Sequence, residues 1–207
     1  LISNKIFFTH KDVKNILVGN DISWSDNLIK GLKSIEKDYV LLMIDDLILN
    51  KKISNKFFMM ISDWININDP NHLRLHISNK PNFYNSFIGK IPNKIPYKIS
   101  LMPSIWKKSF LQNILKKGES AWEFEINGTK RAFKYDEFYS LYNNLIFYEN
   151  SIIKGKWQRS IAKKIMVKND FRPLMSIKEQ IIYNLKVLLY KIFNSLPLYV
   201  RLKLKKL

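Results

Sequence analysis

The segment "SWSDNLIKGLKSIEKDYVLLMIDD", residues 23–46, changes its apolar periodicity within a few residues. Leu28, Leu32 and Ile35 recur at helical spacing, and Ser23 or Ser25 is a suitable N-cap. The apolar run that follows predicts a strand over residues 39–44, buried on both faces. A helix leading directly into a buried strand is typical of α/β proteins, so the segment predicts that fold class.

Similar alternation continues along the chain. Aromatic and aliphatic residues at helical spacing predict a second helix around residues 57–65. The segment 79–96, with three prolines and a glycine, reads as a long loop. Further predictions are strands over 15–18, 72–78 and 97–101, a helix over 104–117 ended by Gly118, and a strand over "AWEFEING", residues 121–128.

Composition restricts the classes of protein. The chain has 207 residues and no cysteine, which excludes a disulfide scaffold and thiolate metal sites. No apolar run reaches the about 18 residues that a membrane span needs, and no signal peptide is visible. The net charge of +18 suggests a polyanionic partner. Lysine dominates over arginine and no nucleic-acid-binding motif is present, so a membrane surface or a phosphate-bearing substrate is favoured over nucleic acid.

Two pairs of acids stand out in this basic chain. Asp45 and Asp46 follow the predicted strand 39–44, and ligands bind at strand carboxyl ends in open α/β sheets. Glu123 and Glu125 share one face of the predicted strand 121–128. The first pair could hold Mg²⁺ or Mn²⁺ on a diphosphate, and the second could supply a general base. Alternatively, the aspartates cap a helix or pair with lysine, and the glutamates are solvated.

Other site signatures are weak or missing. The sequence has no GxxxxGK[ST], GxGxxG or GxSxG segment, which removes the main support for P-loop, dinucleotide-binding and α/β-hydrolase functions. His72 and His76 are four residues apart in a predicted strand. Without other ligand types nearby, we interpret them as ordinary polar residues.

The character of the chain changes at residue 176, which predicts a domain over 1–175 and a basic amphipathic helical tail over 176–207. Apolar residues form one stripe over 178–196, and lysines accompany them. Such a helix can pack on the domain, pair with another helix, or lie on an anionic membrane. The terminal "VRLKLKKL" favours contact with a membrane surface.

Residues 10–175 resemble the GT-A glycosyltransferases of bacterial cell envelopes. "SDNLIKGLKSIEKDYVLLMIDDLIL" is similar to the helix and strand that lead into a DxD-type motif. "PYKISLMPSIWKKSFLQNILKKGESAWEFEING" resembles the acceptor-side segment that carries the catalytic acid, and "NSIIKGKW" resembles a segment near the end of such enzymes. The resemblance implies a GT-A-like, Rossmann-like mixed sheet flanked by helices. The family's first strand would precede Leu1, so an incomplete N-terminus is expected.

The resemblance also implies roles for particular residues. Asp45 and Asp46 correspond to the DxD-type position, which contacts the ribose and, through Mn²⁺ or Mg²⁺, the donor diphosphate. Glu125 corresponds to the catalytic base, with Glu123 as the second choice. The four residues that would approach the nucleotide are Trp24, Ser25, Asp26 and Asn27.

One departure from the family pattern concerns the metal. Leu47 occupies the position where a full DxD motif has its second acid. Arg131 or Lys156 could then neutralise the phosphates in place of a divalent cation.

The expected function is therefore transfer of a sugar from a nucleotide-diphosphate donor to a hydroxyl of an envelope saccharide or lipid-linked acceptor, with inversion. The expected location is cytoplasmic, with peripheral contact to the inner membrane through the tail. The alternative is a non-enzymatic basic module that binds nucleic acid or an anionic membrane.

Overall fold

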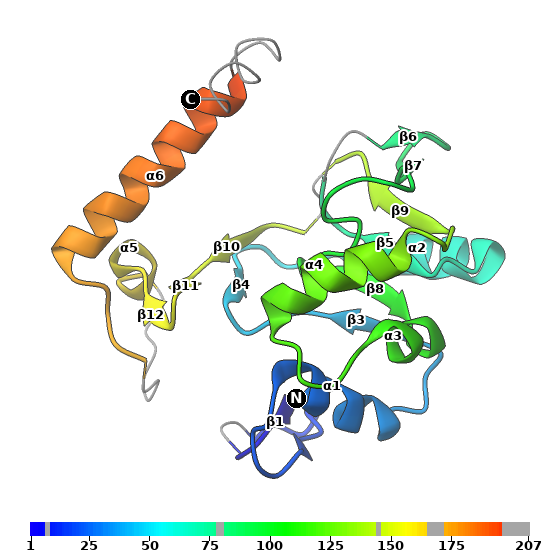
Figure 1. The fold of residues 1–207 in the computed structure, drawn as a ribbon, viewed down its shortest axis with the longest axis horizontal. Helices are drawn as coiled ribbons and strands as arrows, with labels where there is room; N and C mark the ends of the chain where they lie inside the picture. The colour runs from blue at the N-terminus through cyan, green and yellow to red at the C-terminus, as the bar shows by residue number, and fades with distance from the viewer. Residues whose placement is uncertain (7–8, 78–80, 144–145, 165–171, 196–207) are drawn as a thin grey trace. The chain divides into compact units, whose positions relative to one another are not determined.

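The computed structural model describes residues 1–6, 9–77, 81–143, 146–164 and 172–195 (Figure 1). The chain forms two compact units. The larger, here called the α/β unit, comprises residues 1–45 and 49–148. The smaller, the C-terminal unit, comprises residues 46–48 and those from 149 onward. The predicted boundary between 175 and 176 therefore lies inside the C-terminal unit.

The α/β unit is built on a mixed sheet with the strand order β3-β8-β5-β9-β7-β6 in the described residues. β8 is antiparallel to both β3 and β5, β5 is parallel to β9, and β7 is antiparallel to β9 and β6. The prediction of an α/β fold with a mixed sheet is confirmed. The strands are β3 (Tyr39–Leu42), β5 (His72–Arg74), β6 (Asn82–Phe83), β7 (Ile88–Lys90), β8 (Ser104–Lys107) and β9 (Phe138–Leu141).

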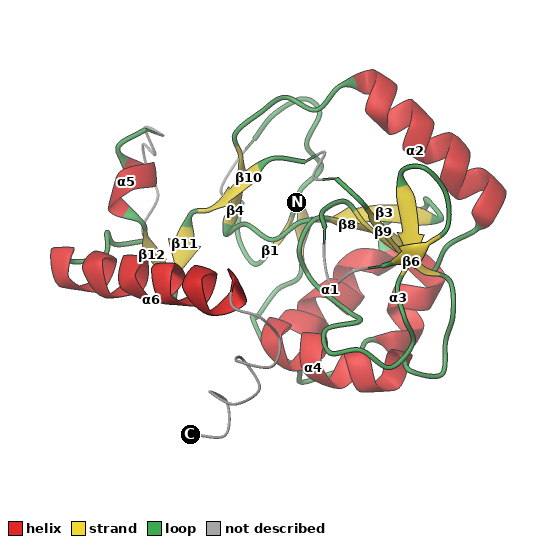
Figure 2. Ribbon diagram, turned by 90° about the horizontal axis from the view of Figure 1, so that it is seen from above, coloured by secondary structure: helices red, strands yellow, loops and turns green. Residues whose placement is uncertain are grey.

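Helices cover both faces of this sheet (Figure 2). α2 (Asn55–Asn68) lies on one face, and α1 (Trp24–Lys33), α3 (Lys108–Ile114) and α4 (Ala121–Ala132) lie on the other. Neighbouring residues in a strand point to opposite faces, so Ile105 and Tyr139 belong to the α2 core while Trp106 and Phe138 belong to the other core. The predicted helical faces of α1 and α2 are confirmed by the burial of Leu28, Leu32, Phe57, Ile61, Trp64 and Ile65.

β3 is an edge strand, so the prediction of a strand buried on both faces is wrong. In the described part of the sheet its only neighbour is β8. Leu41 is 40% exposed, and the other three residues of the strand are half-buried. An apolar run indicates burial only when other elements cover both of its faces, and here one side of the sheet ends.

α4 replaces the strand predicted over residues 121–128. Its buried residues, Phe124, Gly128, Thr129 and Ala132, repeat at helical spacing. Ser120 and Glu123 form a reciprocal capping box that starts the helix. The alternation of "WEFE" is too short to distinguish a strand from the first turn of an amphipathic helix.

Three further predictions need correction. The strand predicted over 72–78 ends at Arg74, and residues 97–101 form turns and bends instead of a strand. The helix predicted over 104–117 is the strand β8 followed by the shorter α3. The predicted loop 79–96 contains the short strands β6 and β7.

Two short strand pairs lie outside the main sheet. β1 (Ile2–Ser3) pairs in parallel with β2 (Ile16–Leu17), which coincides with the strand predicted over 15–18. β4 (Leu47–Leu49) pairs with β10 (Tyr148–Asn150), and the residues of both strands are divided between the two units.

The C-terminal unit has a small core of its own. The hairpin of β11 (Ile152–Ile153) and β12 (Lys156–Trp157) is followed by α5 (Arg159–Ala162) and α6 (Ile177–Ser195). Its buried hydrophobic cluster consists of Ile152, Trp157 and Ile161. The predicted helix 178–196 is thus confirmed almost to its end, and "VRLKLKKL" lies outside the described residues. Among the described residues, none of the helices has the length and apolar composition needed to cross a bilayer.

Candidate active site at the carboxyl edge of the sheet

The carboxyl ends of three parallel strands meet at one edge of the main sheet. β3, β5 and β9 run in the same direction because β8 is antiparallel to both β3 and β5. The register aligns Leu42, Ser104, Arg74 and Ser140 in one row across four strands. Open α/β sheets bind their ligands beyond such an edge, so this row defines the candidate site.

Arg74, the last residue of β5, is the buried cation of this edge. Its side chain is 1% exposed, and Nη2 donates a hydrogen bond to the carbonyl oxygen of Tyr97. Burial lowers the pKa of Arg74 to about 10, and the charge of Glu125 acts in the opposite direction. Arg74 is therefore still charged at neutral pH and lies within electrostatic reach of Glu125.

Glu125 extends from α4 toward this edge. Its Oε1 accepts a hydrogen bond from the backbone N–H of Leu101 at 2.7 Å. One turn later on the same helix, the Thr129 hydroxyl accepts a hydrogen bond from the N–H of Ile99 at 3.0 Å. These two bonds join α4 to the segment that precedes β8. The Glu125 carboxylate is thus held at the carboxyl edge, on the face of the sheet that α4 covers.

Asp45 and Asp46 form a turn after β3. Asp45 is exposed and follows Leu42 by three residues, which places it beyond the carboxyl edge that also carries Arg74 and Glu125. Asp46 belongs to the C-terminal unit, is 40% exposed, and lies 3.9 Å from Nη1 of Arg172. Because neither carboxylate is buried, the turn carries no cost of buried charge.

The donor set for a divalent cation is small. Within the described ranges, no group of three or more His, Cys, Asp or Glu side chains is arranged to hold a metal ion. Mg²⁺ commonly takes only one or two protein carboxylates and completes its shell with substrate phosphate oxygens and water. The exposed carboxylate of Asp45 fits this mode of binding and not that of a cation enclosed by protein ligands.

An open groove lies along β3 next to this edge, with a volume of about 590 Å³. Its walls are apolar apart from Asn50 and two adjacent lysines, Lys51 and Lys52. The lining residues are Leu41, Met43, Leu49, Asn50, Lys51, Lys52, Ile53 and Phe58. The groove lies on the α2 side of the sheet, because Leu41 is in register with Ile105 of the α2 core, and Met43 places one end of it near the acidic turn.

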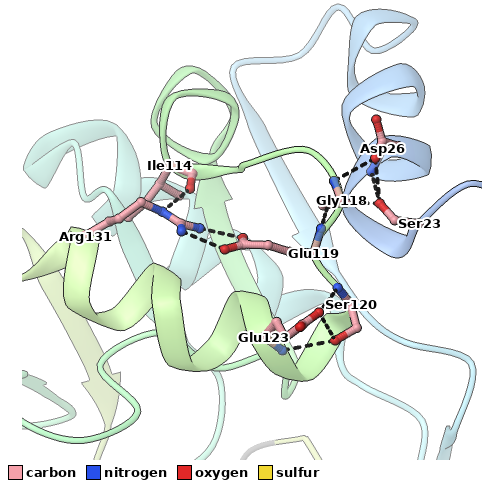
Figure 3. Close-up of polar contacts among 9 residues, drawn as sticks. Ser23, Asp26, Ile114, Gly118, Glu119, Ser120, Glu123 and Arg131 are labelled. Atoms are coloured by element: carbon pink, nitrogen blue, oxygen red, sulfur yellow. Dashed lines mark hydrogen bonds and ion pairs between the residues drawn. The ribbon is translucent and has the colours of Figure 1, made fainter.

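The four residues predicted to approach a nucleotide form the first turn of α1 and have structural contacts, of which those of Asp26 are drawn in Figure 3. The Ser23 hydroxyl caps the helix by accepting a hydrogen bond from the N–H of Asp26 at 3.1 Å. The Asp26 carboxylate accepts hydrogen bonds from the Ser23 hydroxyl at 2.7 Å and the Gly118 N–H at 2.8 Å. These bonds lower the pKa of Asp26. Gly118 has φ of +81° and lies in a turn after α3, not at its C-cap.

The remaining residues of this turn also contact protein. Ser25 is fully buried, and its Oγ accepts a hydrogen bond from the Glu119 N–H at 3.0 Å. The Trp24 ring lies 5.4 Å from that of Phe124, and Asn27 donates to Asp21 at 2.6 Å. The turn therefore connects α1 to the start of α4, and none of these bonds places it at the carboxyl edge.

The other predicted acid, Glu123, is engaged at the N-terminus of α4 (Figure 3). Its Oε2 accepts hydrogen bonds from the Ser120 N–H at 2.8 Å and the Ser120 hydroxyl at 2.7 Å, which lower the pKa of Glu123. Glu123 and Glu125 do not share a strand face, as predicted, because they lie on a helix, where residues two apart point in different directions.

Both cations suggested as substitutes for a metal have protein partners. Arg131 forms a bidentate ion pair with the buried Glu119, at 2.7 and 2.6 Å (Figure 3). Lys156 pairs with Glu179 at 2.6 Å in the C-terminal unit.

Arg74 is the main site residue that the sequence analysis missed. A signal was present in the sequence: polar and apolar residues alternate in "HLRLH", which in a strand places Arg74 on the same face as His72. His72 is fully buried against Trp106, with ring centroids 4.2 Å apart, and neither ring nitrogen has a hydrogen-bond partner among the residues that the structure describes. Burial holds the pKa of His72 well below its usual value, so the ring is neutral.

His76 lines a second, more polar cavity of about 300 Å³ with Asn50 and Tyr148. Its Nδ1 lies 2.8 Å from the Ile77 carbonyl oxygen, and its ring packs edge-on against Tyr148. Burial lowers the pKa of His76. His76 follows β5 by two residues, so it adds a neutral imidazole near the carboxyl edge.

Searches for similar proteins gave no match: no family model, no curated protein and no solved structure resembles this chain detectably.

Proposed function

We propose that the chain is a glycosyltransferase domain with a GT-A-like fold, which transfers a sugar from a nucleotide-diphosphate donor to a hydroxyl of a saccharide or lipid-linked acceptor. One observation carries the proposal. Asp45 follows β3 at the carboxyl edge of the sheet, and the Glu125 carboxylate of α4 lies near the same edge, bonded to the Leu101 N–H and within electrostatic reach of Arg74. The mechanism needs a base and a donor-binding acid in one cleft.

In the proposed reaction, Glu125 is the general base. It removes the proton of the acceptor hydroxyl, whose oxygen attacks the anomeric carbon. The bond from that carbon to the phosphate oxygen breaks, and the nucleoside diphosphate leaves with the bonding electrons. The Leu101 N–H holds the carboxylate in place, and one base on the face opposite the leaving group gives inversion.

The leaving diphosphate requires positive charge. Asp45 would hold a Mn²⁺ or Mg²⁺ ion, which as a Lewis acid stabilises the departing phosphate. Lys51 and Lys52 in the adjacent groove would bind the same phosphates directly.

The first experiment identifies the donor class. The thermal unfolding of the full chain is compared with UDP-, GDP- and CMP-sugars, each with and without Mn²⁺, and with a short oligonucleotide. We expect one nucleotide-sugar to raise the melting temperature, and Asp45→Asn to reduce that shift. Stabilisation by the oligonucleotide alone would instead support a nucleic-acid-binding module.

The second experiment tests the base with the donor so identified. Glu125→Gln retains an oxygen that can accept the Leu101 N–H, so the protein should fold and bind donor. Its transfer rate should fall by about 10²–10⁴-fold, the usual contribution of a general base. Asp63→Asn, a matched change at an exposed position on α2, should not alter the rate. A larger loss from Glu123→Gln than from Glu125→Gln would assign the base to Glu123.

A further inference from the structure

α6 contacts its own unit through polar side chains. Glu179 pairs with Lys156 at 2.6 Å. Gln180 accepts a hydrogen bond from the N–H of Arg159 at 2.9 Å and donates one to Gln158 at 3.3 Å. The half-buried positions of the helix up to residue 190 are Glu179, Gln180, Tyr183 and Val187. They repeat every three or four residues and so form one side of the helix.

The apolar residues of α6 lie on the other side and are exposed. We call these seven residues the apolar stripe: Ile177 (67% exposed), Ile181 (54%), Ile182 (43%), Leu185 (51%), Leu188 (53%), Leu189 (61%) and Ile192 (49%). An ordinary surface helix does the reverse and buries its apolar side. A contiguous exposed apolar surface marks a site of interaction with another molecule or a membrane.

Lysines border the apolar stripe on both sides. At roughly 100° per residue, Lys186 and Lys191 lie about 40° beyond its opposite edges. Lys178 adds a third positive charge at the start of the helix. Glu179 is the one acid between residues 177 and 195, and it is already paired with Lys156. The exposed side of α6 is therefore mainly apolar, with Lys186 and Lys191 at its borders and Lys178 within the angular range of the stripe in the first turn.

We infer that α6 lies in the headgroup region of a membrane that contains anionic lipid, with its apolar stripe toward the acyl chains. The stripe is about 140° wide, broader than the narrow seam of a coiled coil. Flanking lysines match anionic headgroups, whereas in a pair of identical helices they would bring like charges together. This inference concerns the C-terminal unit and does not depend on the reaction proposed above.

The test measures how much of the full chain sediments with vesicles. One set of vesicles is phosphatidylcholine alone, and in the other a quarter of the lipid is phosphatidylglycerol. Ile181→Ser, Leu185→Ser and Leu188→Ser combined should reduce the partition coefficient for the anionic vesicles at least tenfold. Circular dichroism verifies that the variant is folded. The matched control replaces three exposed apolar residues of the α/β unit, Ile22, Met59 and Ile67, by serine, and should bind as the unchanged protein does.

The charge component is tested separately. Lys186→Gln with Lys191→Gln should weaken binding to the anionic vesicles several-fold, and added salt should reduce the difference. Lys33→Gln with Lys116→Gln, at exposed positions of the α/β unit, makes the same change in net charge and should have a smaller effect.

Two outcomes would overturn the inference. One is equal binding of the triple serine variant and the unchanged protein to anionic vesicles. The other is a stable dimer in solution that the triple variant converts to monomer, with no vesicle binding by either. That second outcome would assign the apolar stripe to a second copy of the chain. Neither outcome involves a sugar donor, so the glycosyltransferase proposal is tested independently.

Discussion

α4 and α6 begin with the same capping motif, but α4 buries its apolar side and α6 exposes it. Each starts with an S-x-x-E capping box, Ser120 with Glu123 and Ser176 with Glu179. α4 buries Phe124 completely against the core of the α/β unit. α6 contacts its unit through polar residues and exposes its apolar stripe. The comparison shows that a local signal starts a helix, but the surface opposite decides which side is buried.

The apolar sides of α4 and α6 also serve different purposes, one in folding and the other in binding. The apolar side of α4 contributes to the stability of the α/β unit, because unfolding exposes it to water. The apolar stripe of α6 is exposed to water in the isolated chain as well, so it contributes little to folding and is available for binding.

The largest contrast is between two apolar truncations. Phe124→Ala should lower the free energy of unfolding by about 3–5 kcal/mol, because it leaves a cavity in a packed core. Leu185→Ala, in the apolar stripe, should change it by less than about 0.5 kcal/mol. Urea titrations of both variants measure the difference. A loss for Leu185→Ala comparable to that for Phe124→Ala would show that the stripe is buried.

Ion pairs provide the next contrast. Glu119→Ala should lower the free energy of unfolding by about 1.5–3 kcal/mol. It removes the buried carboxylate that accepts two charge-assisted hydrogen bonds from Arg131. Lys156→Ala removes a pair in which both side chains are 40% exposed and should cost about 0–1 kcal/mol. Denaturation at low and high salt is the measurement. Only the exposed pair should depend strongly on salt, and the reverse dependence would contradict this assignment.

Loss of either capping box should destabilise a different part of the chain. Ser120→Ala should destabilise the α/β unit by about 1 kcal/mol, the usual cost of losing an N-cap. Ser176→Ala should act on α6 without lowering the stability of the α/β unit. Amide hydrogen exchange followed residue by residue distinguishes the two cases. Faster exchange in the main sheet of the Ser176 variant would mean that the two units unfold together.

The smallest effect is a pH dependence at the start of α6. Hydrogen bonds from Lys156 and from the Ser176 N–H lower the pKa of Glu179 to about 2 from 4.5. A depressed pKa stabilises the folded form above 4.5, and this contribution is lost as the pH falls toward 2. The protection factors of the amides in the first turn of α6, corrected for the intrinsic pH dependence of exchange, should therefore fall over that range. Glu179→Gln should remove the dependence, and a persisting dependence would assign it to another group.

Part of the fold could be predicted because it depends on local patterns. The helical spacing of Leu28 and Leu32 correctly located α1, and the apolar residues after Ser176 located α6. The pattern around Glu125 was misread, because a short alternation of apolar and charged residues fits a strand or a helix start. The capping residue Ser120, three positions before Glu123, was the local signal that favours the helix.

The composition of the carboxyl edge could not be predicted in the same way. Arg74, Ser104 and Ser140 are far apart in the chain and meet through strand pairing alone. The sequence placed Asp45 after a strand, but the position of β3 at the end of the sheet depends on which strands lie beside it. Asp45 and Asp46 are consequently exposed, and no buried charge needs compensation there.

The sequence by itself determined the α/β class, the starts of several helices and the amphipathic character of α6, since these depend on residues within a few positions of one another. The tertiary structure alone decided that β3 is an edge strand, that Arg74 and Glu125 share the carboxyl edge, and that α6 exposes its apolar stripe. Burial is a property of the surfaces that meet, and pairing between distant segments determines which surfaces those are.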